Sequence, residues 1–358
     1  MKIIQLVSNL NYGDAIGNDI RAIHETLLRA GYASEIMAVT IHERMREYGK
    51  PVDLSSVKEE DVVLFHKASG DPFTGELRRL PCYKILIYHN ITPASWFLPY
   101  DAVMSLNQFL GRRQLKRELK DMDEAWGDSD YNRQELIRYG FPAEKTEVLP
   151  ILLDLDTPGV PPPRERKKEG PASILFLGRI VPNKKQDDII RVFSCYLEYD
   201  PEARLILIGS WDGWQKYYAK LRGLMADLGL REDQVLFSGH VTDEEKEAYL
   251  SGADLFLCMS EHEGFCIPVL EAMSHDIPVI ARRTSALPET IGENGLLFDH
   301  KDYEGIAREI ARLRSDDAFR ASVLARQREN LKRFSRERTE KKLLDLIEKA
   351  IRNKGKKG

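Results

Sequence analysis

The sequence predicts an α/β fold made of two Rossmann-like, doubly wound domains that face each other across a cleft. Three observations lead to this prediction. The chain has 358 residues, more than one hydrophobic core usually organises. Short apolar runs alternate with helical patterns in both halves, which is typical of parallel sheets with helices on both faces. A proline-rich, charged stretch separates the two halves.

The first domain is predicted to span residues 1–155. Residues 18–30 have the apolar spacing of a crossover helix. Short runs rich in β-branched and aromatic residues alternate with polar segments, and we expect parallel strands at 3–7, 35–39, 62–66 and 84–89.

A linker is predicted at residues 156–170, because four prolines there precede the charged run 164–169. The second domain, 171–330, repeats the alternation. We expect its strands at 173–177, 204–208, 235–237, 255–258 and 278–281. Thr242 and Glu245 have the spacing of a capping box at the start of a helix. A helical pattern runs over about 316–352. We expect segment 331–358 to form a C-terminal helix that packs back on the first domain. We expect the basic tail from residue 353 to be disordered.

The composition is that of a soluble enzyme. The formal net charge of −4 provides no global attraction to nucleic acid or anionic lipid. The 4 cysteines lack the spacing of a disulfide scaffold or of a zinc knuckle, which favours a reducing cytoplasm. The apolar start at residues 3–7 is too short for a signal peptide, and no run is long enough to span a membrane.

Two carboxylates, Glu263 and Glu271, bracket a glycine-containing loop and the first turn of a helix. Pro268 suits that first turn, and the predicted strand 255–258 leads into the loop. We expect the amides of residues 264–266 to point at an anion near the positive helix end. One carboxylate is then placed for sugar hydroxyls and the other for a ribose. The alternative is that an acid near a helix start only stabilises the helix.

Two cations, Arg179 and Lys184, follow Gly178 at the carboxyl end of the predicted strand 173–177. Ligands of open α/β sheets bind at this end of the strands. The two side chains are suited to clamp a diphosphate and to stabilise the charge that develops as it leaves. A solvated basic loop is the alternative.

Residues 178–184 (GRIVPNK) and 263–273 (EGFCIPVLEAM) together resemble the retaining family-4 glycosyltransferases of the GT-B fold. The resemblance covers the second domain closely and the first mainly in layout. It implies that Arg179 and Lys184 bind the donor diphosphate, and that Glu271 binds the ribose. It further implies that Glu263, Gly264 and Phe265 bind the donor sugar. No metal is required by this chemistry, and we expect none.

The rest of the donor site is predicted from glycines and polar residues that follow strands in both domains. His240 and Val241 follow a strand where the family commonly holds its nucleobase, and Gly209 either contributes to this pocket or only forms a tight turn. In the first domain we expect the amide of Gly17 to approach the donor. The spacing of the glycines in this segment is not that of a dinucleotide fingerprint, which disfavours a nicotinamide cofactor.

Two further side chains are singled out by their positions. His89 follows the predicted strand 84–89 and is similar in position to a family histidine that faces the acceptor and the reacting centre; a purely structural histidine is the alternative. Cys266 stands where relatives frequently have glycine. We expect its thiol to line the donor-sugar pocket, or to be a small buried filler, and the donor sugar therefore does not carry over from the family.

A cluster of cations is predicted on one helix: Arg112, Arg113, Lys116, Arg117 and Lys120. This cluster is suited to peripheral contact with anionic lipid if the acceptor is lipid-linked. A solvated helix face is the alternative.

The sequence thus predicts a retaining, hexosyltransferase-type glycosyltransferase of glycan biosynthesis. It would move a sugar from a nucleoside-diphosphate sugar to a saccharide or lipid-linked acceptor hydroxyl, with no nucleic-acid partner. We expect it in the cytoplasm or at the inner face of the membrane. A nucleotide-sugar epimerase of the same fold and a noncatalytic nucleotide-sugar-binding subunit are the alternatives. The nucleobase, sugar, acceptor, linkage and oligomeric state stay open.

Overall fold

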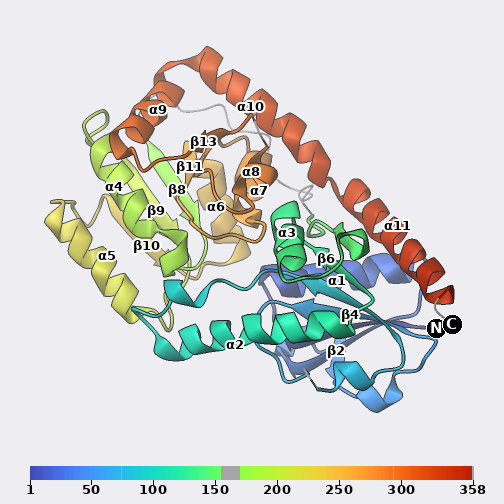
Figure 1. The fold of residues 1–358 in the computed structure, drawn as a ribbon. Helices are drawn as coiled ribbons and strands as arrows, with labels where there is room; N and C mark the ends of the chain where they lie inside the picture. The colour runs from blue at the N-terminus through green and yellow to red at the C-terminus, as the bar shows by residue number, and fades with distance from the viewer. Residues whose placement is uncertain (74, 155–169, 293, 357–358) are drawn as a thin grey trace. The chain divides into compact units, whose positions relative to one another are not determined.

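The computed structural model describes residues 1–73, 75–154, 170–292 and 294–356. The chain divides into two compact units (Figure 1). The first unit comprises the described residues of Met1–Ala94, Val103–Asp154 and Arg333–Gly358, and the second those of Ser95–Ala102 and Leu155–Lys332. Of the predicted linker 156–170, all but Gly170 lies outside the described residues.

The first unit contains a seven-stranded parallel sheet in the order β3-β2-β1-β4-β5-β6-β7. Its strands are β1 (Ile3–Leu10), β2 (Ser34–Ile41), β3 (Gly49–Pro51), β4 (Val62–Lys67), β5 (Tyr83–Tyr88), β6 (Glu124–Gly127) and β7 (Thr146–Val148). The four predicted strands are confirmed. Strands β3, β6 and β7 were not predicted, because three or four residues are too few to show a two-residue period.

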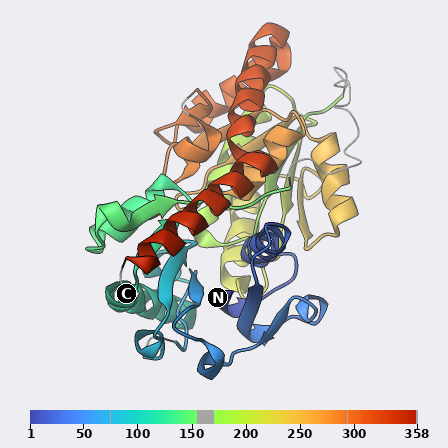
Figure 2. The same cartoon turned by 90° about the vertical axis from the view of Figure 1, so that its right-hand side faces the viewer.

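Both faces of this sheet are covered by helices, namely α1 (Ala15–Arg29), α2 (Ala102–Glu118), α3 (Asp130–Arg138) and α11 (Arg336–Gly355). Helix α2 begins at the boundary with the second unit. Leu343 and Ile347 of α11 pack into the same core cluster as Ile3 and Ile85 of the sheet. In Figure 2, α11 accordingly crosses in front of strands of this sheet.

The second unit contains a six-stranded parallel sheet in the order β10-β9-β8-β11-β12-β13. Its strands are β8 (Ser173–Leu177), β9 (Arg204–Ile208), β10 (Val235–Gly239), β11 (Leu255–Cys258), β12 (Val279–Arg282) and β13 (Leu296–Phe298). Its helices are α4 (Gln186–Tyr196), α5 (Gln215–Asp227), α6 (Asp243–Gly252), α7 (Ile267–Ser274), α8 (Leu287–Ile291), α9 (Tyr303–Ser315) and α10 (Asp317–Leu331). The five predicted strands and the capping box of Thr242 and Glu245 are confirmed.

The C-terminal segment corrects two predictions. The helical pattern over 316–352 is broken by the 3₁₀ turn Lys332–Phe334, so that α10 and α11 are separate helices. The expected disordered tail is helical as far as Gly355, because α11 continues through residues 353–355. The remaining short 3₁₀ turns are Glu43–Met45, Leu54–Ser56, Leu77–Arg79, Ala94–Trp96, Leu119–Asp121, Ala143–Lys145 and Pro182–Lys184. No helix among the described residues is both long and apolar enough to cross a membrane.

Candidate functional site

Three glycines lie side by side at the carboxyl ends of β8, β9 and β10. The amide of Gly178 donates to the carbonyl of Ile208 at 2.8 Å, and the amide of Gly209 to that of Gly239 at 3.0 Å. A Cβ atom on Gly209 would come within 2.1 Å of the carbonyl oxygen of Gly178. Gly209 is therefore needed for this close approach of two strand ends, and its contribution to the nucleobase pocket stays a prediction.

Lys184 and Glu263, predicted separately from two motifs, are paired with each other. The Lys184 Nζ atom lies 2.6 and 2.7 Å from the two Glu263 carboxylate oxygens. Burial acts to lower the pKa of Lys184, but the carboxylate of Glu263 outweighs burial and raises it. The backbone of the buried Glu263 is also held in place, because its amide donates to Ser285 Oγ at 2.8 Å.

Backbone and side-chain bonds join the two loops that carry this pair. Asn183 Nδ2 donates to the carbonyl of His262 at 3.0 Å, and the amide of Glu261 donates to the carbonyl of Asn183 at 2.8 Å. Gln186, at the start of α4, donates to the carbonyl of Arg179 at 3.0 Å. The loop after β8 and the loop between β11 and α7 are thus held as one surface.

Arg179 is the cation on this surface without a partner. Its side chain is exposed and has no hydrogen bond or ion pair within the described part of the chain. Desolvation by its neighbours lowers the pKa of the guanidinium, and no acidic group offsets this. A partly desolvated arginine that has no acidic partner and shares a loop with a lysine is suited to bind an anion.

Glu271 of α7 is also paired with a cation. Lys246 of α6 places its Nζ atom 2.9 Å from a carboxylate oxygen of Glu271. Both side chains are about a quarter exposed, at 26% and 22%. Burial acts to lower the pKa of Lys246, and Glu271 outweighs it, so that this pKa is raised. Glu271 therefore faces a cation before any ligand arrives.

The other predicted donor contacts surround these pairs. Gly264 is half-buried and Phe265 is buried, with the carbonyl of Phe265 accepting from Thr290 Oγ1 at 2.5 Å. His240 is exposed and Val241 half-buried, immediately after β10.

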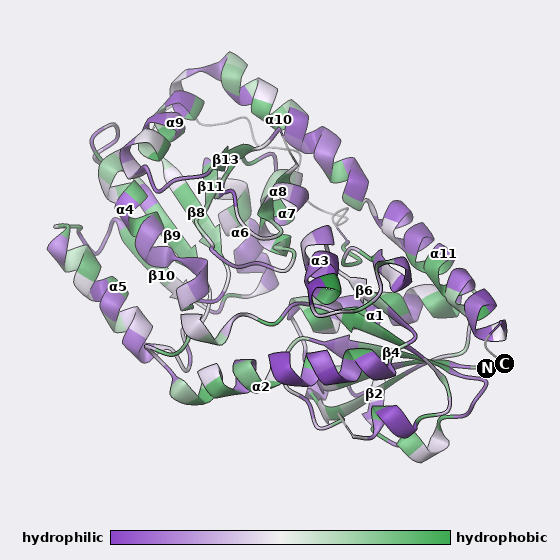
Figure 3. Ribbon diagram, viewed as in Figure 1, coloured by the Kyte–Doolittle hydropathy of each residue, from purple (hydrophilic) through white to green (hydrophobic). Residues whose placement is uncertain are grey.

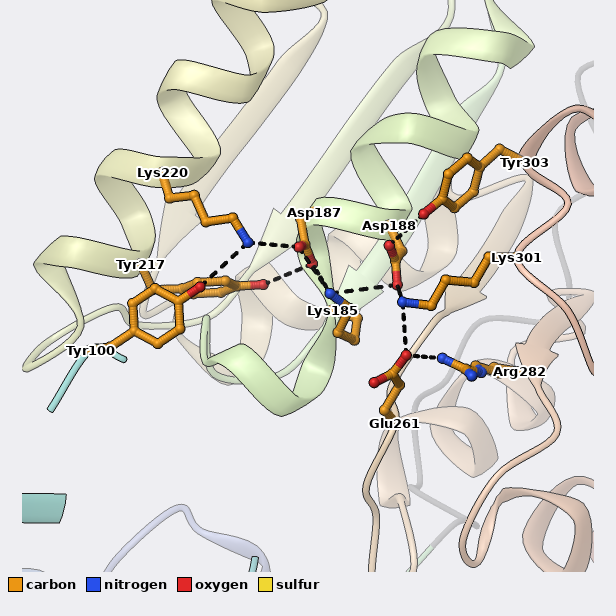
Figure 4. A network of polar contacts seen from close by, with 10 residues as sticks. All are labelled: Tyr100, Lys185, Asp187, Asp188, Tyr217, Lys220, Glu261, Arg282, Lys301 and Tyr303. Atoms are coloured by element: carbon orange, nitrogen blue, oxygen red, sulfur yellow. Dashed lines mark hydrogen bonds and ion pairs between the residues drawn. The ribbon is translucent and has the colours of Figure 1, made fainter. Parts of the chain in front are cut away.

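A network of charged and aromatic side chains connects to both loops through Lys185 and Glu261 (Figure 4). Lys301 Nζ lies 2.7 Å from the carboxylate of Asp188 at the start of α4 and 2.8 Å from that of Glu261. Arg282 also pairs with Glu261, and Tyr303 donates to Asp188 at 2.7 Å. This network was not predicted, because the residues drawn in Figure 4 lie on six separate segments of the sequence and share no local pattern.

Two cysteines lie beside the Lys184–Glu263 pair. Cys258 ends β11, and Cys266 precedes α7; both are buried. The two sulfur atoms lie within 4.8 Å of each other. Interaction with Cys266 lowers the pKa of Cys258, and interaction with Cys258 raises that of Cys266. Cys266 is thus buried next to Glu263, and its place in a donor-sugar pocket stays a prediction.

In the first unit, the amide of Gly17 is not available to a ligand. It donates to Asp14 Oδ1 at 2.6 Å as part of the N-cap of α1. A Cβ atom on Gly17 would approach the carbonyl oxygen of Asn11 to 2.0 Å. The structure explains this glycine by local packing and does not support the predicted approach of its amide to the donor.

The imidazole of His89 is buried. Its Nδ1 atom lies 3.0 Å from Asp128 Oδ2, and its Nε2 atom lies 2.8 Å from Nδ1 of His66. His66 Nε2 in turn lies 3.0 Å from Gln5 Oε1. Both nitrogens of His89 are bonded and its side chain is 1% exposed, so this arrangement argues against direct proton transfer between His89 and an acceptor.

His66 was given no role from the sequence, and the strand register explains why it belongs here. It pairs with Ile87 on the neighbouring strand β5, so His66 and His89 end adjacent strands. Desolvation lowers the pKa of His66 well below its usual range. Burial acts to lower the pKa of His89, but Asp128 outweighs burial and raises it. Burial also raises the pKa of the nearby Asp19 to about 7.

A small cavity of about 90 Å³ lies at the carboxyl ends of β1 and β4, next to this histidine pair. His66 contributes to its lining with Asn9, Asn11 and Asp14. A larger cavity of about 660 Å³ lies between α3, β7 and α11, lined in part by Arg133, Arg338 and Lys342.

Two groups of side chains among the described residues place metal-ligand atoms within 4.8 Å of one another. One is Asp19, His66 and His89, and the other is Cys258, Glu263 and Cys266. The expectation that the protein uses no metal therefore stays a prediction.

The basic cluster on α2 needs one correction. Arg112 points inward, where its guanidinium donates to Glu135 at 2.7 Å and to the carbonyl of Ile91 at 2.9 Å. The other four cations, Arg113, Lys116, Arg117 and Lys120, are exposed. The same helix face carries exposed apolar residues nearer its start, at Val103, Leu106, Phe109 and Leu110. Figure 3 shows this change along α2 from hydrophobic to hydrophilic.

A protein-family model matches a range that lies mostly in the second unit. Residues 162–338, slightly less than half of the chain, match the family model described as Glycosyl transferases group 1. This match contains both motif segments and the two ion pairs.

Two relatives that are similar to this chain are named as mannosyltransferases. The chain is 29% identical over 215 residues to O-antigen chain mannosyltransferase B of Escherichia coli, covering 58% of this chain and 55% of that protein. It is 30% identical over 229 residues to the GDP-mannose-dependent alpha-(1-6)-phosphatidylinositol monomannoside mannosyltransferase of Mycolicibacterium smegmatis, covering 60% and 59%. The chain thus spans somewhat more than half the length of these two relatives.

Solved structures match over nearly the whole chain. HepE of Anabaena, in complex with UDP and glucose, superposes with a TM-score of 0.74 at 18% identity, covering 98% of this chain and all of that one. Sucrose-phosphate synthase of Thermosynechococcus elongatus has a TM-score of 0.73 at 19% identity, covering 98% and 99%. The predicted fold class, two Rossmann-like parallel units of GT-B architecture, is confirmed. Together the comparisons support a GT-B glycosyltransferase, without distinguishing family 4.

Proposed function

We propose that the protein is a retaining glycosyltransferase that moves a hexosyl group from a nucleoside-diphosphate sugar to an acceptor hydroxyl. The observation that carries this proposal is the Lys184–Glu263 pair at the carboxyl ends of β8 and β11, with Arg179, which has no partner among the described residues, in the same loop as Lys184. Sheet ends of this kind are where α/β proteins bind ligands. Two cations and a carboxylate at that place fit a sugar diphosphate.

In the proposed complex, the donor replaces protein partners. The diphosphate takes over Lys184 from Glu263, and Arg179 adds a second cation. The freed carboxylate of Glu263 accepts hydrogen bonds from hydroxyls of the sugar. Glu271 accepts from the ribose, in exchange for its contact with Lys246. Lys184, Glu263 and Glu271 thus each have a partner both before and after binding, which limits the cost of desolvation.

The chemical step follows from these positions. The bond between the anomeric carbon and the diphosphate breaks, and charge accumulates on the leaving group, where Arg179 and Lys184 stabilise it. The acceptor oxygen forms the new bond on the same face, and its proton passes to the departing phosphate. Because this scheme needs no histidine base, the buried His89 is assigned a positioning role, and no metal cofactor is required.

For the donor, GDP-mannose is our first choice, because the name of one relative specifies it and the other relative is a mannosyltransferase. The names of these relatives also indicate the acceptor class, an O-antigen saccharide in one case and a phosphatidylinositol mannoside in the other. We propose a saccharide or lipid-linked acceptor.

A lipid-linked acceptor would bring the first unit to a membrane surface. On α2, Leu106 and Leu110 are followed at helical spacing by Arg113 and Arg117, so one exposed face is apolar and then basic. We propose that this face contacts anionic lipid. Cosedimentation with phosphatidylglycerol vesicles, and not with phosphatidylcholine vesicles, is the expected result. Equal sedimentation with both would contradict it.

The test of the activity is a panel of nucleotide sugars. Donor binding should raise the melting temperature of the protein, because a ligand of the folded state stabilises it. The best donor is then incubated with and without saccharide or lipid-linked acceptors, and the products are identified. Release of nucleoside diphosphate with a new α or β linkage of unchanged configuration is expected. Conversion of the donor without acceptor would show an epimerase, and binding without any turnover would favour a noncatalytic subunit.

A further inference from the structure

Cys266 adopts a backbone conformation that a side chain normally avoids. Its φ is +76° and its ψ is +68°, which lies in the left-handed region. Glycine adopts this region freely, whereas other residues are strained there by roughly 1–2 kcal/mol. The thiol makes no capping hydrogen bond to the first turn of α7. Strain of this kind is kept mainly where the side chain has a function.

The surroundings of the thiol indicate what that function is. The sulfur atoms of Cys266 and Cys258 and a carboxylate oxygen of Glu263 all lie within 4.8 Å of one another, and all three residues are buried. Cys258 ends β11 and Cys266 precedes α7, so the intervening loop folds back and brings the two thiols together. Ser260 Oγ lies 3.4 Å from the Cys258 sulfur.

We propose that Cys258, Cys266 and Glu263 form a binding site for a soft divalent metal ion of the zinc class. Two thiolates and a carboxylate are a donor set that zinc accepts, with bond lengths of about 2.0–2.3 Å. Ligand atoms on a tetrahedral ion at those bond lengths are separated by roughly 3.3–3.8 Å. Atoms that already lie within 4.8 Å of one another reach these separations with a contraction of at most about 1.5 Å. A water molecule or Ser260 completes the coordination.

Metal binding changes the protonation and the pairing of this cluster. Each thiol forms a bond to the ion and releases its proton to solvent, so two protons leave for each ion bound. The ammonium group of Lys184 leaves the carboxylate of Glu263, which then becomes a ligand. The net charge of the cluster is unchanged by this exchange, since one divalent ion replaces two thiol protons.

The consequence for activity rests on the proposed function. A metal-bound Glu263 cannot accept hydrogen bonds from the donor sugar, and the ion occupies space next to that sugar. Zinc and the nucleotide sugar should therefore exclude each other, and zinc should inhibit transfer.

The binding test uses cobalt(II), whose thiolate complexes have charge-transfer absorption that carboxylate or imidazole complexes lack. The full chain is titrated with cobalt(II) under a phosphine reductant, and then with zinc. We expect thiolate-to-cobalt bands that saturate at one ion per chain and disappear on addition of zinc. Absence of these bands would overturn the proposal, as would a disulfide between the two cysteines that persists under the reductant.

The matched variants are Cys266→Gly and Cys195→Ser. The first is expected to fold, because glycine relieves the strain at this φ, and to lose the bands with at least about a tenfold weaker metal affinity. Cys195 is half-buried and away from the cluster, so its variant should retain both bands and affinity. Bands that survive in a folded Cys266→Gly protein would overturn the site.

A separate readout distinguishes this proposal from the proposed function. Transfer is measured first with a chelator and then with added zinc. We expect zinc to inhibit the wild type and Cys195→Ser, and to leave whatever transfer Cys266→Gly retains. Thiolate bands in a protein that never transfers sugar would refute the function and keep the metal site. Transfer that zinc affects equally in all three proteins would refute the coupling between them.

Discussion

The polar clusters at the carboxyl ends of the strands in the two sheets differ in how their hydrogen bonds are completed. In the first unit, His89 lies between Asp128 and His66, and His66 continues to Gln5, so every imidazole nitrogen is bonded and the side chains are buried. In the second unit, the Lys184–Glu263 and Lys246–Glu271 pairs keep between 8% and 26% of their side chains exposed, and Arg179 has no partner in the described chain.

This difference indicates which cluster a ligand can enter. Opening the histidine cluster leaves buried polar groups without partners, at about 1–3 kcal/mol each. An ion pair next to solvent can exchange its carboxylate for a diphosphate with little loss, because a stronger charge-assisted contact replaces it. We therefore assign positioning to the first cluster and ligand exchange to the second, and four experiments test that division.

The largest effect is expected from Lys184→Met, which should lower turnover by about 10²–10³-fold through loss of the leaving-group contact. Steady-state kinetics with the best donor measures this loss, and Lys216→Met, an exposed lysine of α5, is the control. The variant should also lose stability, because Glu263 is left buried and unpaired. Adding Glu263→Gln should restore stability and not turnover. Recovery of turnover in the double variant would mean that the pair is only structural.

The pH dependence of stability should change by about 4 kcal/mol in Asp19→Asn, at about 1.4 kcal/mol per pKa unit. Burial raises the pKa of Asp19 to about 7 in the folded protein, whereas an unfolded aspartate titrates near 4. The folded state therefore binds this proton more tightly, and wild-type stability falls as pH rises from about 4 to 7. The variant lacks this fall, so its stability relative to wild type should rise over that range and then level off. Urea unfolding at several pH values measures it, and parallel curves for the two proteins would contradict the assignment.

Arg179→Ala should lower turnover by roughly 10–100-fold, a loss of about 1.4–2.7 kcal/mol. Its stability should stay within about 0.5 kcal/mol of wild type, because the guanidinium has no partner to lose. This variant is the counterpart of Lys184→Met, in which both quantities change. A large loss of stability would show that Arg179 has a structural role.

The smallest effect is expected from Glu271→Ala, which should weaken donor binding about tenfold, or about 1.4 kcal/mol, with turnover at saturation changed less than threefold. Donor titration by calorimetry measures this loss. Lys246→Ala is the matched variant, since it removes the competing cation and should not weaken donor binding. Equal weakening in both variants would indicate that the pair only supports α6 and α7.

The fold was largely predictable because its signals are local. Strand β8 and the start of α6 appear in the sequence as an apolar run and a capping box, and both were located correctly. Strands β3 and β7 were missed because they are too short to be periodic. Helix α11 was predicted as a helix, but its last turn is held by a contact distant in sequence, since Asn353 Nδ2 donates to Glu124 at 2.9 Å.

The sequence by itself determined the alternation of strands and helices, the two motif segments and the charged residues that they carry, since these depend on neighbours within a few positions. Only the tertiary structure decided which side chains pair with each other. It joined Lys184 to Glu263, closed His89 between Asp128 and His66, turned Arg112 inward, and placed Cys258 beside Cys266. Such pairs depend on the order and register of strands that are far apart in the chain, and no local pattern contains that information.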